Sequence, residues 1–143
     1  MKKILSTVFL IIIFLSIVGC EKNSNNVTEK VSDTVKVFIN DKEYKLNLYD
    51  NETVSSLVKL FPLEVTMKTL SENEVYVYLD EKFPTNSSNP KTINAGDVML
   101  YGDNCLVIFY KTFNTSYSYT KIGHINDLPI INEDTVSVRI EKE

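Results

Sequence analysis

Short segments of alternating apolar and polar residues fill this chain from residue 34 onward, and they constrain its fold more than any other feature. In residues 34–39 every second residue is Val or Ile. Because successive side chains of a strand point to opposite faces, this pattern predicts a strand with one buried face. Residues 40–43 (Asn-Asp-Lys-Glu) indicate a turn, and residues 44–48 alternate again. The two segments therefore predict a β-hairpin.

Further strand-like segments follow up to the C-terminus, separated by turn-forming Gly, Asn, Asp and Pro residues. They are residues 63–70, 74–79, 98–101, 106–110, 122–125 and 135–140. With the hairpin, this makes about eight short strands, which favours a mainly β fold of the barrel or sandwich type.

One helix is expected between the hairpin and the next strand. Apolar residues from Val54 to Phe61 fall at positions i, i+3, i+4 and i+7, which places them on one helical face. Asp50 or Asn51 can cap the start, and Pro62 ends the helix. Its apolar stripe should cover one open end or face of the sheet.

The first 20 residues differ from the rest of the chain. Lys2 and Lys3 precede an apolar run over residues 4–18, and Gly19-Cys20 follows. The run is too short for a comfortable membrane span of about 20 residues. A positive charge, an apolar run, a small residue and a Cys in this order resemble the signal peptide and lipobox of bacterial lipoproteins. The resemblance implies that the Cys20 thiol is diacylglycerated, with fatty acyl chains such as palmitate, and that the leader is then cut before Cys20.

This interpretation divides the chain into three parts: a signal peptide over residues 1–19, a lipidated Cys20 with a tether up to residue 33, and a domain over residues 34–143. The tether is polar and has no apolar period, so it is expected to be flexible. Two acyl chains give stable anchoring. We therefore expect a membrane-anchored lipoprotein of the bacterial cell envelope. Export by the signal peptide would place it on the extracytoplasmic face of the cell membrane. The membrane is thus the partner predicted through Cys20.

Charge and residue usage argue against several classes of function. The 143 residues carry a net charge of −4, which becomes −6 without Lys2 and Lys3, so nucleic acid is not an expected partner. No spacing typical of a metal or cofactor site is present, so neither is predicted. If Cys20 is acylated, Cys105 is the only other cysteine; it lies in an apolar run and is expected to be buried and inert.

Six segments resemble the bacterial cyclophilin-like domain family. They are residues 48–54, 60–62, 73–74, 95–101, 106–110 and 116–123. The most specific parts are the Gly-Asp-(apolar)₃-Tyr block at 96–101 and the Phe-Tyr to Tyr-Thr-x-Ile-Gly block at 109–123. The match runs over residues 35–140, and it implies a closed antiparallel barrel of about eight strands with one covering helix.

Peptidyl-prolyl isomerisation is the activity that this resemblance first suggests. Catalytic cyclophilins use an Arg to polarise the target amide, with Gln, aromatic and His side chains in the same groove. This chain has no Gln and no Trp, and its one Arg is Arg139 near the C-terminus. The resemblance therefore implies a domain of the family without the catalytic set, and no catalytic residue is assigned.

The best candidates for ligand contact are the aromatic residues of the second half. Tyr117 and Tyr119 are expected on one face of a strand within the polar-aromatic stretch 112–120. With Tyr101, Phe109 and His124 they would form a groove on the barrel that suits a peptide or small ligand.

Three functions stay open at this point. The leading hypothesis is a membrane-tethered, non-catalytic binding module. The alternatives are a divergent prolyl isomerase acting on exported proteins, and a structural component of an envelope complex. The alternative for the aromatic rings is that they fill the barrel and its mouth, which would leave no groove.

Overall fold

The structure is a computed structural model that describes residues 28–143. The expected signal peptide, Cys20 and most of the expected tether lie outside the described residues, so the cleavage and lipidation predictions are not addressed by it. The described part holds ten strands and one short helix with a 3₁₀ turn. The strands are β1 (Val31–Ile39), β2 (Lys42–Tyr49), β3 (Leu63–Leu70), β4 (Glu74–Tyr78), β5 (Thr92–Ile93), β6 (Asp97–Tyr101), β7 (Cys105–Phe109), β8 (Phe113–Asn114), β9 (Thr120–Ile125) and β10 (Thr135–Glu141).

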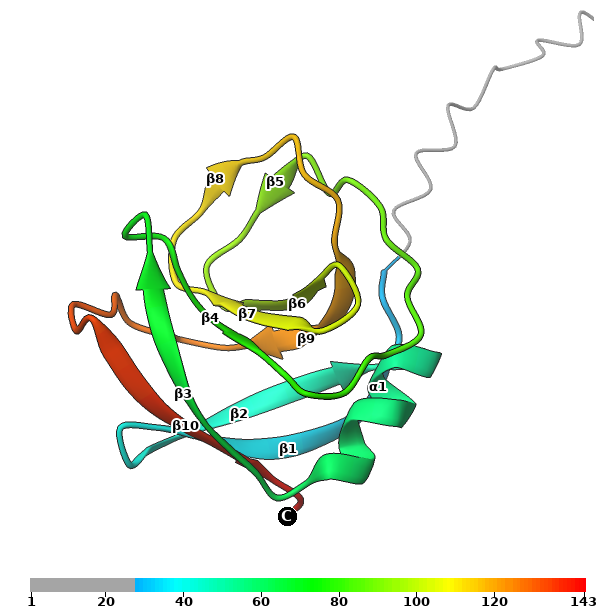
Figure 1. The fold of residues 1–143 in the computed structure, drawn as a ribbon, viewed down its shortest axis with the longest axis horizontal. Coiled ribbons are helices and arrows are strands. Elements are labelled where there is room, and N and C mark those ends of the chain that lie inside the picture. Colours follow the sequence, from blue (N-terminus) through cyan, green and yellow to red (C-terminus); the bar gives the residue numbers. More distant parts are fainter. Residues whose placement is uncertain (1–27) are drawn as a thin grey trace, which may run out of the picture.

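Eight of these strands close into an antiparallel barrel, which confirms the predicted fold class (Figure 1). Their order around the barrel is β1-β10-β3-β4-β7-β6-β9-β2, and β2 pairs back onto β1. The two remaining strands, β5 and β8, form a small sheet of their own outside the barrel. Closure leaves the barrel with no unpaired edge strand.

The interior of the barrel is the main hydrophobic core, and the alternation seen in the sequence fills it. Val35, Val37 and Ile39 of β1 are all buried, as are Leu46 and Leu48 of β2. The predicted hairpin is therefore correct. Such burial of Val and Leu side chains stabilises the fold by about 1.5–3 kcal/mol per residue.

The first strand begins earlier than the sequence indicated. β1 starts at Val31, which pairs with Tyr49 of β2, so residues 31–33 belong to the sheet and not to the tether. The Ser32 hydroxyl donates to the Leu48 carbonyl at 3.3 Å. These three residues are exposed, which explains why the apolar period did not reveal them.

The helix is present but shorter than predicted. α1 spans Glu52–Leu57 and tightens into a 3₁₀ turn, η1, over Val58–Leu60. The Asn51 side chain caps it, since it accepts a hydrogen bond from the Val54 amide at 2.9 Å, and its Nδ2 donates to the Lys121 carbonyl of β9. The buried helical side chains join the barrel core, so the helix covers the barrel as expected (Figure 1).

A second, smaller core lies outside the barrel on strand β7, where all five residues are buried. Leu106 and Ile108 point into the barrel, whereas Cys105, Val107 and Phe109 point outward. The outward side chains pack with Ile93 of β5, Met99 of β6, Phe113 of β8 and Tyr119, which directly precedes β9. The β5–β8 sheet therefore acts as a lid over one part of the outer barrel face (Figure 1).

Gly96 joins this outer layer to the barrel. Its amide donates to the Phe109 carbonyl at 2.7 Å, and its carbonyl accepts from the Ile125 amide at 2.8 Å. The residue has φ +99°, and a Cβ atom here would collide with the Ile125 carbonyl. Only glycine meets both conditions at this turn.

No helix within residues 28–143 is both long and apolar enough to cross a lipid bilayer.

Candidate functional site

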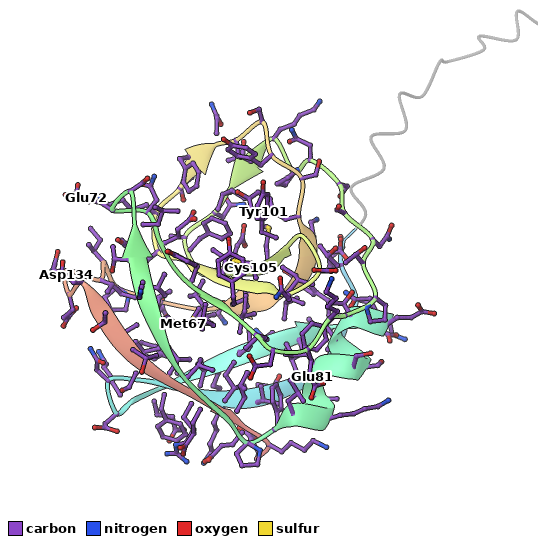
Figure 2. The ribbon with its side chains drawn as sticks, viewed as in Figure 1. Met67, Glu72, Glu81, Tyr101, Cys105 and Asp134 are labelled. Atoms are coloured by element: carbon purple, nitrogen blue, oxygen red, sulfur yellow. The ribbon has the colours of Figure 1, made fainter. Side chains whose placement is uncertain are left out.

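The outward side chains of β4, β7 and β6 form cross-strand rows next to the second core. In the β4–β7 ladder, Tyr76 lies opposite Val107 and Tyr78 opposite Cys105. From the other side, Tyr101 of β6 also lies opposite Cys105. An apolar floor thus runs along β7 with tyrosines on both flanking strands. Figure 2 shows Tyr101 above Cys105 on this face of the barrel.

The segment between β8 and β9 adds a wall next to β6, on the side away from β4. The Tyr101 ring lies 6.1 Å from the Tyr117 ring and 5.7 Å from the Tyr119 ring, measured between centroids. The Tyr101–Tyr117 pair is nearly perpendicular, at 85°. Such edge-to-face contacts stabilise aromatic pairs by about 0.5–1.5 kcal/mol.

The prediction that Tyr117 and Tyr119 share one face of a strand is wrong. The strand ends at Asn114, residues 115–118 form no strand, and Tyr119 makes only an isolated bridge with Ser88. The Thr115 hydroxyl accepts from the Tyr117 amide at 3.1 Å, a local bond that replaces strand pairing. Tyr119 is consequently buried, while Tyr117 is 61% exposed.

These side chains line a hollow that we name the tyrosine groove. Its volume is about 320 Å³, at the lower end of the range for small-molecule sites. It is lined by Leu70, Glu74, Tyr76, Tyr78, Tyr101, Cys105, Val107, Tyr117 and Tyr119.

Exposed apolar surface is concentrated in this groove. The described residues include six large hydrophobic side chains that are strongly exposed, and four of them line the groove: Leu70, Tyr78, Tyr101 and Tyr117. Clustered exposed apolar side chains mark binding sites far more often than scattered ones do.

Glu74 contributes the one charged side chain of the groove lining. Burial raises the pKa of its carboxyl above the ordinary value, and no neighbouring charge or hydrogen bond contributes to that shift. A half-buried carboxylate without a partner is destabilising unless a cation or donor reaches it. The groove therefore carries one carboxylate that has no ion-pair partner among residues 28–143.

Cys105 forms part of the floor and is buried and free, as predicted. Burial raises the pKa of its thiol, the Glu74 charge adds to that increase, and the Tyr78 side chain opposes it. A raised pKa keeps the sulfur as a thiol at neutral pH, which makes it a poor nucleophile.

Two residues expected in the groove lie elsewhere. Phe109 is fully buried beneath Tyr119, at 5.5 Å between ring centroids, so it supports the groove without lining it. His124 lies on β9, where its Nδ1 is 3.0 Å from the Asp97 carboxylate, and it does not line the groove.

Arg139 also lies away from the groove. Its guanidinium packs over the Phe38 ring at 4.2 Å and pairs with the carboxylate of Glu141. It lines a separate hollow formed by β1, β3 and β10. Among residues 28–143, no group of three or more His, Cys, Asp or Glu side chains is placed to hold a metal ion.

The sequence interpretation missed six of the groove residues: Leu70, Glu74, Tyr76, Tyr78, Cys105 and Val107. A signal for β4 was available, because Tyr76 and Tyr78 occupy the face opposite the apolar Val75 and Val77. Two tyrosines on the outer face of a half-buried strand are a reason to expect a second packing surface there.

Comparison with known proteins agrees with this architecture. A family model described as "Cyclophilin-like family" matches residues 37–141. The solution structure of a hypothetical protein from Archaeoglobus fulgidus is similar in fold, with a TM-score of 0.55 and 18% sequence identity over 81% of this chain and 98% of that chain. No curated protein sequence matches the chain significantly.

Proposed function

The chain belongs to the cyclophilin-like family, and we propose that it is a lipid-anchored, non-catalytic binding module whose tyrosine groove holds a peptide or small ligand outside the cytoplasm. One observation carries the binding part of the proposal: four of the six strongly exposed large hydrophobic side chains of the described residues converge on this one groove. Rigid, amphipathic tyrosine rings provide contact area at a low cost in conformational entropy.

The positions of the polar side chains favour binding over catalysis. Isomerisation of a prolyl bond requires a donor that stabilises the twisted amide in the groove. Arg139 lines a different hollow, His124 contacts Asp97 on another side of the barrel, and Cys105 is held as a thiol. The groove instead offers tyrosine rings and a carboxylate, which suit recognition of a ligand.

The anchoring part of the proposal rests on residues 1–20. The order of Lys2 and Lys3, the apolar run and Gly19-Cys20 supports acylation of Cys20. Acylation would attach the barrel to the outer face of the membrane through a tether of about ten residues before β1. The domain would then sample ligands close to the cell surface.

Ligand-observed NMR on the full-length chain in detergent micelles tests the binding claim. A panel of short peptides and small aromatic or aliphatic compounds is screened against the parent chain and against the double variant Tyr78→Ala/Tyr117→Ala. Both side chains are more than half exposed, so their removal should leave the barrel folded. We expect hits on the parent chain that are lost in the double variant.

Ile130→Ala is the matched control, since Ile130 is 58% exposed but lies outside the groove. This variant should retain every hit. If the hits survive loss of both tyrosines, or disappear in the Ile130 variant, the groove is not the binding site. A panel without any hit on the parent chain would also contradict the proposal.

A further inference from the structure

We propose, building on the ligand-binding role of the tyrosine groove, that its ligand is a small organic cation: an alkylated ammonium group that sits between the tyrosine rings, with the Glu74 carboxylate as its counter-ion.

Charge gives the first argument. Glu74 is a half-buried carboxylate in the groove lining, and no Lys, Arg or His side chain lines the groove with it. On the neighbouring strand, Lys68 lies opposite Tyr76 in the register, but it forms no ion pair with Glu74 within the described residues. A bound cation would supply the missing partner, and a bound anion would meet like charge.

Unused aromatic faces give the second argument. Elsewhere in the described part of the chain, Lys42 lies over the Tyr44 ring at 5.3 Å and Arg139 over the Phe38 ring at 4.2 Å. The groove tyrosines have no such cation from the chain among residues 28–143. The rings pack edge-to-face in the Tyr76–Tyr78 and Tyr101–Tyr117 pairs, and a cation from outside would meet the ring faces that those contacts leave uncovered.

The spacing of the walls fits such a guest. Tyr78 and Tyr101 both lie opposite Cys105, one on each side of β7. Their backbones are thus two strand spacings apart, about 10 Å. This separation places a tyrosine on each side of the Cys105 floor, so a cation bound over the floor would meet aromatic rings from both walls.

The carboxylate lies at one end of the groove and acts on a guest through its electrostatic field. Glu74 shares the outer face of β4 with Tyr76 and Tyr78, about 7 Å from Tyr76 and about 13 Å from Tyr78 along the strand. After burial, its charge is a further cause that raises the pKa of Cys105 and of Tyr119, both of which line the groove. The electrostatic field of the Glu74 carboxylate therefore reaches Cys105 in the groove floor and Tyr119 in the opposite wall.

Calorimetric titration of the full-length chain in detergent micelles tests this inference. The probes are choline, its uncharged carbon isostere 3,3-dimethylbutan-1-ol, and propionate as an anion. We expect choline to bind at least about tenfold more tightly than the isostere, and propionate not to bind measurably. Glu74→Gln should weaken choline binding about tenfold and leave binding of the isostere unchanged.

Glu81→Gln is the matched control, because it removes the same charge from an exposed carboxylate outside the groove. Its choline affinity should equal that of the parent chain. Equal affinity for choline and the isostere, tighter binding of propionate, or no choline binding would each overturn the inference. Hits in the peptide and fragment screen that need Tyr78 and Tyr117 would still stand in those cases, so the two proposals fail separately.

Discussion

Tyr78 and Tyr101 lie on the two strands that flank β7, each directly opposite Cys105 in the register. This relationship turns an ordinary stretch of barrel wall into a groove with two aromatic sides and an apolar floor. The segment after β8 adds Tyr117 and Tyr119, and Glu74 adds one charge. The predictions below separate what holds this groove together from what makes it bind.

Phe109 and Tyr117 were both expected to contact ligand, but they should behave in opposite ways. Phe109→Ala removes a fully buried ring and should lower the free energy of unfolding by about 3–5 kcal/mol. Tyr117→Ala removes an exposed ring and should cost less than about 1 kcal/mol. Urea unfolding followed by circular dichroism measures both. Similar losses in the two variants would show that Tyr117 is a packing residue.

Glu74→Gln should stabilise the fold at neutral pH while it weakens cation binding. Because burial raises the pKa of Glu74 in the folded chain, the folded state binds the proton more tightly than the unfolded state does. The stability contributed by this group is therefore present at low pH and lost as pH rises through the raised pKa. Urea unfolding at pH 7 and at pH 3.5 should show the variant more stable than the parent chain only at pH 7. A variant that is less stable at pH 7 would mean that Glu74 has a partner in the fold.

Gly96 and Gly102 both have positive φ, yet substitution should be costly only at Gly96. A Cβ atom at Gly96 collides with the Ile125 backbone, whereas Gly102 has open space around it. Gly96→Ala should lower the free energy of unfolding by about 3 kcal/mol or more, and Gly102→Ala by about 1 kcal/mol. Thermal unfolding of the two variants side by side decides this. A smaller loss at Gly96 than at Gly102 would contradict the close approach described for this turn.

The two cysteines should differ in their effect on membrane attachment. Cys20→Ser should move the chain out of the membrane fraction and abolish incorporation of labelled palmitate. Cys105→Ala should leave both properties unchanged, because Cys105 is a buried side chain of the groove floor. Cell fractionation with immunodetection measures the distribution. Membrane retention of the Cys20 variant would defeat the anchoring proposal.

Much of the barrel follows from the sequence because its strands obey a simple period. Val35, Val37 and Ile39 alternate with outward residues, and all three are buried. The Asn51 cap was also foreseeable, since its side chain satisfies the Val54 amide as helix caps do. The helix is shorter than its apolar stripe because the backbone tightens into a 3₁₀ turn at Val58–Leu60, ahead of Pro62.

The second core could not be read from local patterns. β7 is apolar at every position, and such a run does not reveal which residues face the barrel and which face outward. The outer partners depend on the two-residue ladder between Thr92–Ile93 and Phe113–Asn114, which is too short to leave a periodic signal.

The sequence predicted only one wall of the groove, because the other wall also depends on strand order. Its far wall was expected from Tyr101, Tyr117 and Tyr119, but its near wall on β4 meets them only through the strand order β4-β7-β6. His124 was misplaced because closeness in sequence to Tyr119 does not determine on which side of β9 the side chain emerges.

The most direct test of the account is whether a bound ligand touches the groove floor. With choline bound to the full-length chain, intermolecular nuclear Overhauser effects are measured between the choline N-methyl protons and the valine methyl groups. The account predicts contacts to Val107, which lies in the floor between the tyrosine walls. Contacts to Val65 and Val138 in the hollow beside Arg139, or no contact at saturating choline, would contradict the placement of a cation in the tyrosine groove.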